Sequence, residues 1–332
     1  MPELRKDPVL GRWIIISKER QKRPTDFPVE VSRGSGGFCP LCPGNESFTP
    51  PEVYAARPGN SPADSPGWDV RVVPNKYPAL VIEGELAKEG VGQFDKMSGI
   101  GAHEVVIECP DHDERFSDLS PEKMARVFQA YKERILDLEK DHRFQYVMVF
   151  KNHGQAAGAS LEHSHSQLIA LPILPRMIVS ELEGAKSHFN YKERCIFCDI
   201  IRQEIQQEER VVCQNELFIT ITPFAPRTPF EMWILPKTHR SSYYEMNERE
   251  LEALSELFRE TLQRLCGCIK NVPYNFVLHT GPLRSGNLEY YHWHFEIVPK
   301  LTSIAGFEWG SGFYINPLPP EEAAAYLRQV EN

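Results

Sequence analysis

The sequence has neither a long apolar run nor an excess of basic residues. No stretch of its 332 residues approaches the roughly 20 apolar residues of a membrane helix. The N-terminus, Met1 to Asp7, is charged and lacks the apolar region of a signal peptide, so we expect a cytoplasmic protein that does not contact a membrane. The formal charge of −9 argues against a nucleic-acid-coating protein, because phosphate contacts need a basic surface.

The sequence also lacks a P-loop, a G-x-G-x-x-G fingerprint and a disulfide framework. Eight cysteines are few for so long a chain, and four of them form two C-x-x-C pairs, Cys39/Cys42 and Cys195/Cys198. In a reducing compartment this spacing indicates metal binding or redox chemistry. Prolines and a glycine surround the first pair and argue against the helix that a redox pair usually opens. A zinc-binding turn is therefore favoured there.

One order of elements occurs twice along the chain. Each half contains a C-x-x-C pair, two strands, a histidine, an amphipathic helix, another strand and an H-x-H motif. The predicted helix starts, Ser120 and Asn247, each lie eight residues after a histidine, His112 or His239. This repeat predicts an α+β protein made of two copies of one unit, residues 1–175 and 176–332. Antiparallel sheets with helices packed on them would join into one pseudo-symmetric body.

Each half also provides the same four metal-ligand types in the same order. Zinc is commonly bound by four cysteine and histidine ligands, and such a complete set leaves no open position for substrate. We therefore expect two structural Zn²⁺ ions. The predicted ligands are Cys39, Cys42, His112 and His163 in the first half, and Cys195, Cys198, His239 and His292 in the second.

The first H-x-H motif continues as His163-Ser-His165-Ser-Gln167. In an extended segment these two histidines and the glutamine share one face, and the two serines share the other. With His163 bound to metal, His165 remains free as a nucleophile towards phosphorus, and Gln167 can donate to a phosphoryl oxygen. The second half has Glu296 in place of the glutamine, so only the first half is expected to be catalytic.

A turn rich in small residues precedes this motif. Asn152, Gly154 and Gly158 allow close backbone approach to phosphates, and Ser160 adds a hydroxyl donor. Near the N-terminus, Arg20-Gln-Lys-Arg23-Pro predicts an exposed basic loop.

Taken together, these motifs resemble those of the galactose-1-phosphate uridylyltransferase family, a branch of the histidine-triad superfamily. The resemblance covers nearly the whole chain and implies two tandem histidine-triad-like repeats and a homodimer. It rests on Arg20-x-x-Arg23-Pro, Cys39-Pro-Leu-Cys-Pro-Gly-Asn, Pro74-Asn-Lys-Tyr-Pro-Ala-Leu, Asn152-x-Gly-x-x-x-Gly-x-Ser160, H-x-H-x-Q and Tyr314-Ile-Asn-Pro317.

The resemblance implies a ping-pong mechanism on a nucleotide sugar and a sugar 1-phosphate. His165 would attack the α-phosphorus, release a sugar 1-phosphate and carry a nucleotidyl group until a second sugar 1-phosphate accepts it. By the same resemblance, substrate contacts fall on Asn152, Gly158, Ser160 and Gln167 for the phosphates, on Asn75 for the nucleotide, and on Arg20 and Arg23 from a partner subunit.

One motif departs from the family pattern and leaves the nucleotide open. Uridylyltransferases usually carry H-P-H-G-Q, whereas H-S-H-S-Q resembles relatives that transfer adenylyl groups and phosphorolyse ADP-glucose. The favoured hypothesis is exchange of UDP-glucose and galactose 1-phosphate for glucose 1-phosphate and UDP-galactose. The alternatives are an ADP-glucose phosphorylase that passes AMP to phosphate, and a zinc-stabilised nucleotide-binding protein without turnover. Glu181 and His279 fall near positions that some relatives use for iron, so the second metal could also be iron.

Overall fold

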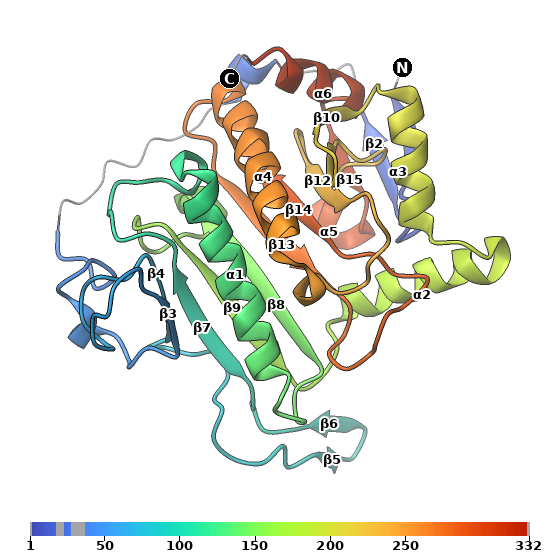
Figure 1. The fold of residues 1–332 in the computed structure, drawn as a ribbon. Coiled ribbons are helices and arrows are strands. Elements are labelled where there is room, and N and C mark those ends of the chain that lie inside the picture. The colour runs from blue at the N-terminus through green and yellow to red at the C-terminus, as the bar shows by residue number, and fades with distance from the viewer. Residues whose placement is uncertain (1, 18–22, 28–36, 331–332) are drawn as a thin grey trace.

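The computed structural model describes residues 2–17, 23–27 and 37–330 and confirms the α+β class (Figure 1). A ten-stranded sheet forms its centre, with every neighbouring pair of strands antiparallel. The first half contributes β3 (Tyr54–Ala56), β4 (Val70–Pro74), β7 (Ala102–Ile107), β8 (Tyr146–His153) and β9 (His165–Leu171). The second half contributes β10 (Val211–Gln214), β11 (Phe218–Ile221), β12 (Met232–Pro236), β13 (Tyr274–His279) and β14 (His294–Pro299).

The strand order is symmetric about the centre of the sheet, as expected for an internal repeat. It runs β10-β11-β12-β14-β13-β8-β9-β7-β4-β3, with β13 and β8 at the centre. Moving outward from that pair, β14 corresponds to β9, β12 to β7, β11 to β4 and β10 to β3. The two halves therefore share one sheet across their central strands, and each strand of one half has a counterpart in the other.

Helices α1 (Pro121–Leu138) and α4 (Glu248–Cys268) lie side by side on one face of this sheet (Figure 1). Their starts are those expected from the sequence. The Ser120 side chain accepts a hydrogen bond from the Lys123 backbone, and Asn247 forms a capping box with Glu250. Beneath them is an aromatic core that includes Phe128 and its neighbours in the second half, so the two helices are buried against a shared core.

The second half differs from the expected repeat around its C-x-x-C pair. Cys195 is the N-cap of α3 (Ile196–Gln207), so this pair opens a helix, whereas the first pair lies in turns. Helix α2 (Arg176–Lys192), which precedes it, has no counterpart among the described residues of the first half. The strand expected from residue 290 begins only at His294, because the preceding residues turn towards the metal-ligand cluster.

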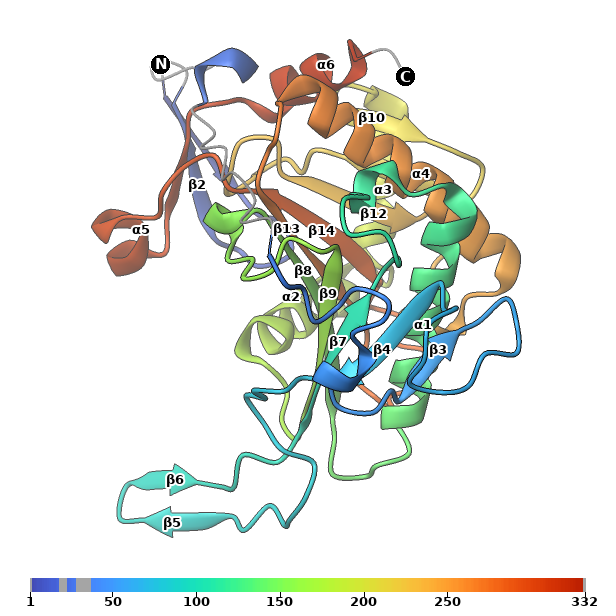
Figure 2. The same ribbon diagram turned by 90° about the vertical axis from the view of Figure 1, so that its left-hand side faces the viewer.

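The remaining elements lie at the ends of the chain and at its periphery. A three-stranded sheet joins β1 (Glu3–Lys6), β2 (Trp13–Ile16) and β15 (Tyr314–Asn316). Figure 2 shows the hairpin of β5 (Glu89–Val91) and β6 (Phe94–Lys96) projecting from the body, as does α5 (Gly306–Ser311). The last helix is α6 (Pro320–Arg328). No helix in the described part of the chain is long and apolar enough to cross a membrane.

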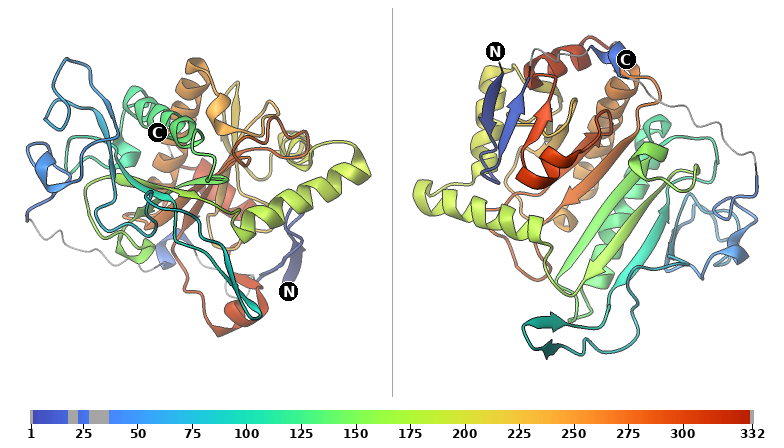
Figure 3. Two further views of the ribbon diagram at one scale, coloured as in Figure 1. Left: turned by 90° about the horizontal axis from the view of Figure 1, so that it is seen from below. Right: turned by 180° about the vertical axis from the view of Figure 1, so that it is seen from behind.

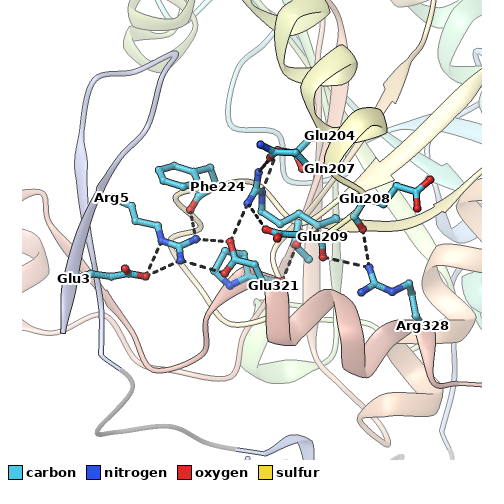
Figure 4. Close-up of polar contacts among 12 residues, drawn as sticks. Glu3, Arg5, Glu204, Gln207, Glu208, Glu209, Phe224, Glu321 and Arg328 are labelled. Carbon is cyan, nitrogen blue, oxygen red and sulfur yellow. Dashed lines mark hydrogen bonds and ion pairs between the residues drawn. The ribbon is translucent and has the colours of Figure 1, made fainter. Parts of the chain in front are cut away.

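An ion-pair cluster ties the two chain ends to the second half (Figure 4). Glu321 of α6 pairs with Arg5 of β1 at 2.7 Å and with Arg210 at 3.0 Å. Arg210 also pairs with Glu204 of α3 at 2.9 Å. Arg210 and Glu204 are nearly fully buried, so this cluster is part of the interior and holds β1 and α6 against the second half.

Candidate functional site

The predicted nucleophile lies at the start of β9, and alternation along this strand separates its two faces as expected. Ser166 bonds to Tyr131 of α1 at 2.6 Å, so the serines face the helix layer. His165 and Gln167 therefore face the opposite side of the sheet. Figure 3 (right) shows β7, β8 and β9 from that side, with no helix drawn over them. Among the described residues, no α-helix lies over this face of the first half (Figure 3), and His165 on it is 7% exposed.

The hydrogen bonds of His165 determine which of its nitrogens can react. Its Nδ1 lies 2.8 Å from the backbone carbonyl of His163. A carbonyl only accepts, so Nδ1 carries the ring proton, and Nε2 of the neutral ring keeps its lone pair. Burial, and then the nearby charge of Lys151, lower the pKa of His165 and favour this neutral form. His165 therefore presents an unprotonated Nε2.

Gln167 is oriented by a histidine that the sequence motifs did not single out. The Ala79 backbone N–H donates to His103 Nδ1 at 3.1 Å, so the neutral ring carries its proton on Nε2. This Nε2 lies 2.8 Å from Gln167 Oε1 and donates to it. The amide nitrogen of Gln167 remains available as a donor. Asn75 lies beside the same ring, 3.2 Å from His103 Nε2, which places Asn75 and Gln167 together.

A buried ion pair supports the strand from its other face. Lys151 Nζ bonds to Glu108, to Ser164 Oγ at 3.2 Å and to the His165 carbonyl at 2.8 Å. Ser164 Oγ donates to the same Glu108 carboxylate at 2.6 Å, and the Tyr131 hydroxyl approaches it at 3.4 Å. Lys151 and Glu108 are each 1% exposed. The two motif serines thus belong to a charged network directly beneath the nucleophile.

The turn between β8 and β9 has the open backbone predicted for it. Gly154 and Gly158 have φ of 82° and 89°, a left-handed region that side chains disfavour. Asn152 is held by Asn275 of the second half, whose Nδ2 donates to Asn152 Oδ1 at 2.8 Å. Ser160 is exposed beyond the turn.

The two arginines expected from a partner subunit remain a prediction. Arg20 lies outside the described residues. Arg23 precedes a short 3-10 turn, where its backbone N–H donates to Asp26 at 2.8 Å.

The first predicted metal-ligand set comes together, with its four ligand atoms within 4.8 Å of one another. His163 Nδ1 lies 3.7 Å from Cys39 Sγ and 3.5 Å from Cys42 Sγ. Tetrahedral zinc with Zn–S near 2.3 Å and Zn–N near 2.1 Å places sulfur and nitrogen about 3.6 Å apart. His163 Nε2 donates to the Cys109 carbonyl at 2.8 Å, which leaves Nδ1 free to bind metal. The set fits a tetrahedral metal ion.

The second set repeats this geometry closely. Cys198 Sγ lies 3.4 Å from His239 Nδ1 and 3.7 Å from His292 Nδ1, and Cys195 completes the cluster. His292 Nε2 donates to the Pro236 carbonyl at 2.8 Å, as His163 does in the first half. The paired rings also match: His112 and His163 have centroids 5.3 Å apart, and His239 and His292 5.4 Å apart.

A third cluster joins Glu181, His279, His294 and Glu296. His279 uses both ring nitrogens, with Nδ1 3.0 Å from Glu181 and Nε2 3.5 Å from Glu296. Burial lowers its pKa, but the two carboxylates outweigh that effect and raise it to about 10. Arg227, whose side chain is 16% exposed, also pairs with Glu296. Glu181 and His279, the two residues considered for iron, thus lie together in a group of side chains that could hold a metal ion.

Sequence reasoning missed several of these residues. In the sequence, Lys151, Glu108 and Tyr131 occupy ordinary strand and helix positions, and His103 belongs to none of the motifs. A signal existed for the first pair, since a lysine and a glutamate within or directly after apolar strands must be paired when they are buried. No comparable signal identified Arg227.

The fold defines an α+β protein whose two halves share one sheet, with Cys/His clusters that could hold metal ions, and comparisons identify its family. The N-terminal domain of galactose-1-phosphate uridyl transferase matches residues 1–175, and a domain of unknown function matches residues 102–329. ADP-glucose phosphorylase from Arabidopsis thaliana is 38% identical over 99% of this chain and 93% of the relative. Galactose-1-phosphate uridylyltransferase from Thermotoga maritima is 29% identical over 100% and 99%. The chain belongs to the galactose-1-phosphate uridylyltransferase family.

Solved structures agree with this placement. A crystal structure of Arabidopsis thaliana ADP-glucose phosphorylase with bound ADP-glucose has a TM-score of 0.85 and 38% identity, and covers 100% of this chain and 99% of that one. A uridylyltransferase structure has a TM-score of 0.76 and 30% identity, with coverage of 99% and 97%. Both nucleotide classes are therefore represented among structural relatives.

Proposed function

We propose that this protein transfers a nucleotidyl group through a covalent intermediate on His165. The observation that carries the proposal is the hydrogen bond from His165 Nδ1 to the His163 carbonyl, which leaves the lone pair on Nε2. That atom is on the face of the sheet that no described α-helix covers, beside the amide of Gln167. A neutral, oriented imidazole is a good nucleophile towards phosphorus.

In the first step, His165 Nε2 forms a bond to the α-phosphorus while the bond from that phosphorus to the bridging oxygen breaks. The leaving group is a sugar 1-phosphate. The amide of Gln167 donates to a non-bridging oxygen as charge grows there. In the second step an acceptor oxygen attacks the same phosphorus, and the bond to Nε2 breaks to restore the histidine.

ADP-glucose with phosphate as acceptor is the reaction that we place first. The 38% identity and the TM-score of 0.85 to a phosphorylase with bound ADP-glucose support it, together with the H-S-H-S-Q motif. The products would be glucose 1-phosphate and ADP. The exchange favoured by the sequence, UDP-glucose with galactose 1-phosphate, is the second candidate, supported by the N-terminal family match and the Thermotoga maritima relative.

The remaining assignments belong to the same proposal. The clusters around His163 and His292 would hold two structural zinc ions that fix the strands without touching substrate. Iron, with Glu181 and His279 among its ligands, is the alternative for the second metal. Residues 1–175 would form the catalytic repeat and 176–332 the supporting one. Substrate contacts are proposed for Asn75, Asn152, Gly158 and Ser160, and for Arg20 and Arg23 across a homodimer. The cytoplasmic location also stays a prediction.

Labelling at the α-phosphate tests the proposal. The protein is incubated with α-labelled ADP-glucose or UDP-glucose without acceptor, and acid-labile label on His165 is measured. Label from ADP-glucose that phosphate converts to ADP supports the first candidate, and label from UDP-glucose that galactose 1-phosphate removes supports the second. The His165→Asn variant should take no label, whereas exposed His142→Asn should behave as the parent. Label that persists in His165→Asn would contradict the covalent mechanism.

A further inference from the structure

A cavity of about 610 Å³ lies in the second half, away from His165. Its walls come from α3, from the segment that follows β11, and from residues 6–8 beside β1. Its volume is in the range of small-molecule sites.

The internal repeat relates the position of the cavity to that of the first-half site. Strand β11 corresponds to β4, which is followed by Asn75, and β11 is followed by the cavity residues Pro223, Phe224 and Ala225. Trp233 of β12 also lines the cavity, and its ring lies 5.3 Å from that of His294, the counterpart of His165. The cavity therefore adjoins the second H-x-H motif much as the segment around Asn75 adjoins the first.

Two polar atoms in the cavity-lining residues have no partner among the described residues. They are Trp233 Nε1, a donor, and Glu204 Oε2, an acceptor. Trp233 is 5% and Glu204 3% exposed. The other oxygen of Glu204 is held by Arg210 at 2.9 and 3.1 Å, so the carboxylate is fixed (Figure 4). Buried polar groups are rarely left unpaired, and a ligand that offers one acceptor and one donor would pair both atoms.

The rest of the lining includes apolar and aromatic side chains and two exposed arginines. Phe224 is 43% exposed, and the Arg5 guanidinium lies 4.8 Å from the centre of its ring. Ile196 and Ile221 add apolar surface. Arg194 and Arg202 are half exposed or more and share the single carboxylate of Asp199, which leaves positive charge for an anion.

We propose that this cavity is a second binding site, which takes a nucleoside phosphate without turning it over. The base would donate to Glu204 Oε2, accept from Trp233 Nε1 and pack on Phe224, while its phosphate meets Arg194 and Arg202. No transfer occurs there, because His294 is 1% exposed and enclosed among Glu181, Val9 and Leu10. The site rests on its own contacts and does not depend on the activity proposed for His165.

Titration calorimetry of the full-length protein with AMP tests the proposal. We expect an AMP site that Trp233→Phe weakens about tenfold, since one hydrogen bond is lost and the ring is kept. Arg194→Ala with Arg202→Ala should weaken it at least about tenfold, because charge-assisted bonds to phosphate are stronger. Adenosine and inorganic pyrophosphate, each alone, should bind more weakly than AMP. Exposed Arg249→Ala is the matched control and should change nothing.

The first-half site is followed separately by labelling of His165. Two AMP per chain, one of them lost in these variants while His165 still labels, supports the proposal. A single AMP site per chain that is lost in the variants also supports the cavity proposal. In that case the failure lies with the proposal for His165. AMP binding that is unchanged in both variants would overturn the proposal. So would the absence of AMP binding by the folded parent protein at millimolar AMP.

Discussion

Replacing Lys151 by methionine should destabilise the protein far more than replacing Lys151 and Glu108 together. Lys151 Nζ has three acceptors in the structure: the Glu108 carboxylate, Ser164 Oγ and the His165 carbonyl. The single change leaves the carboxylate buried without its counter-charge, which costs about 3–5 kcal/mol in comparable sites. The double variant Lys151→Met/Glu108→Gln removes both charges and should lie within about 1 kcal/mol of the parent.

Catalysis should respond differently from stability. Both variants lose the hydrogen bond that holds the His165 carbonyl, so the nucleophile is less well positioned in each. We expect single-turnover labelling of His165 to slow at least about tenfold in the double variant, with KM for the nucleotide sugar unchanged. Urea unfolding gives the free energies. Equal stability of the single and double variants would refute the buried-pair reasoning, and parent-like labelling in the double variant would refute the positioning role.

Further predictions concern the metal, the chain ends, the amide and pH. Cys198→Ala should lower the metal content by one ion per chain in elemental analysis and reduce Tm, without removing label from His165. Glu321→Gln should cost about 1–3 kcal/mol in urea unfolding, because Arg5 and Arg210 lose a shared carboxylate. Gln167→Glu should slow labelling more than Gln167→Ala does, since a carboxylate repels the phosphoryl oxygens. For His279, a pKa raised from 6.5 to about 10 means stabilisation that is full below pH 6.5 and lost as pH rises towards 10. The difference in unfolding free energy between the parent and His279→Gln should therefore shrink over that range, and a constant difference would contradict the assignment.

The sequence predicted those parts of the molecule that depend on local chemistry or on strict residue types. Ser120 and Asn247 cap helices by contacts within one turn, and eight cysteine and histidine ligands gather because few other residues bind metal. The parts it did not predict depend on partners distant in the chain. Lys151 meets Glu108 across 43 residues, and His279 meets Glu181 across 98. Such pairs are decided by how distant strands and helices come together in the fold, and one strand pattern is compatible with several sheet orders.

The two halves hold the second histidine of each H-x-H motif by the same type of backbone bond but in different surroundings. His165 and His294 make the same bond, from Nδ1 to the carbonyl two residues earlier, at 2.8 and 3.2 Å. Their surroundings differ, since Gln167 is a neutral donor on a face that no described α-helix covers, whereas Glu296 is a buried carboxylate paired with Arg227. A carboxylate there opposes an incoming phosphate, and helices α2 and α3 together with the segment around Val9 pack beside it. If His165 is the nucleophile, as proposed, we expect the charge and burial next to His294 to prevent the same reaction there, because His294 itself has the same tautomer.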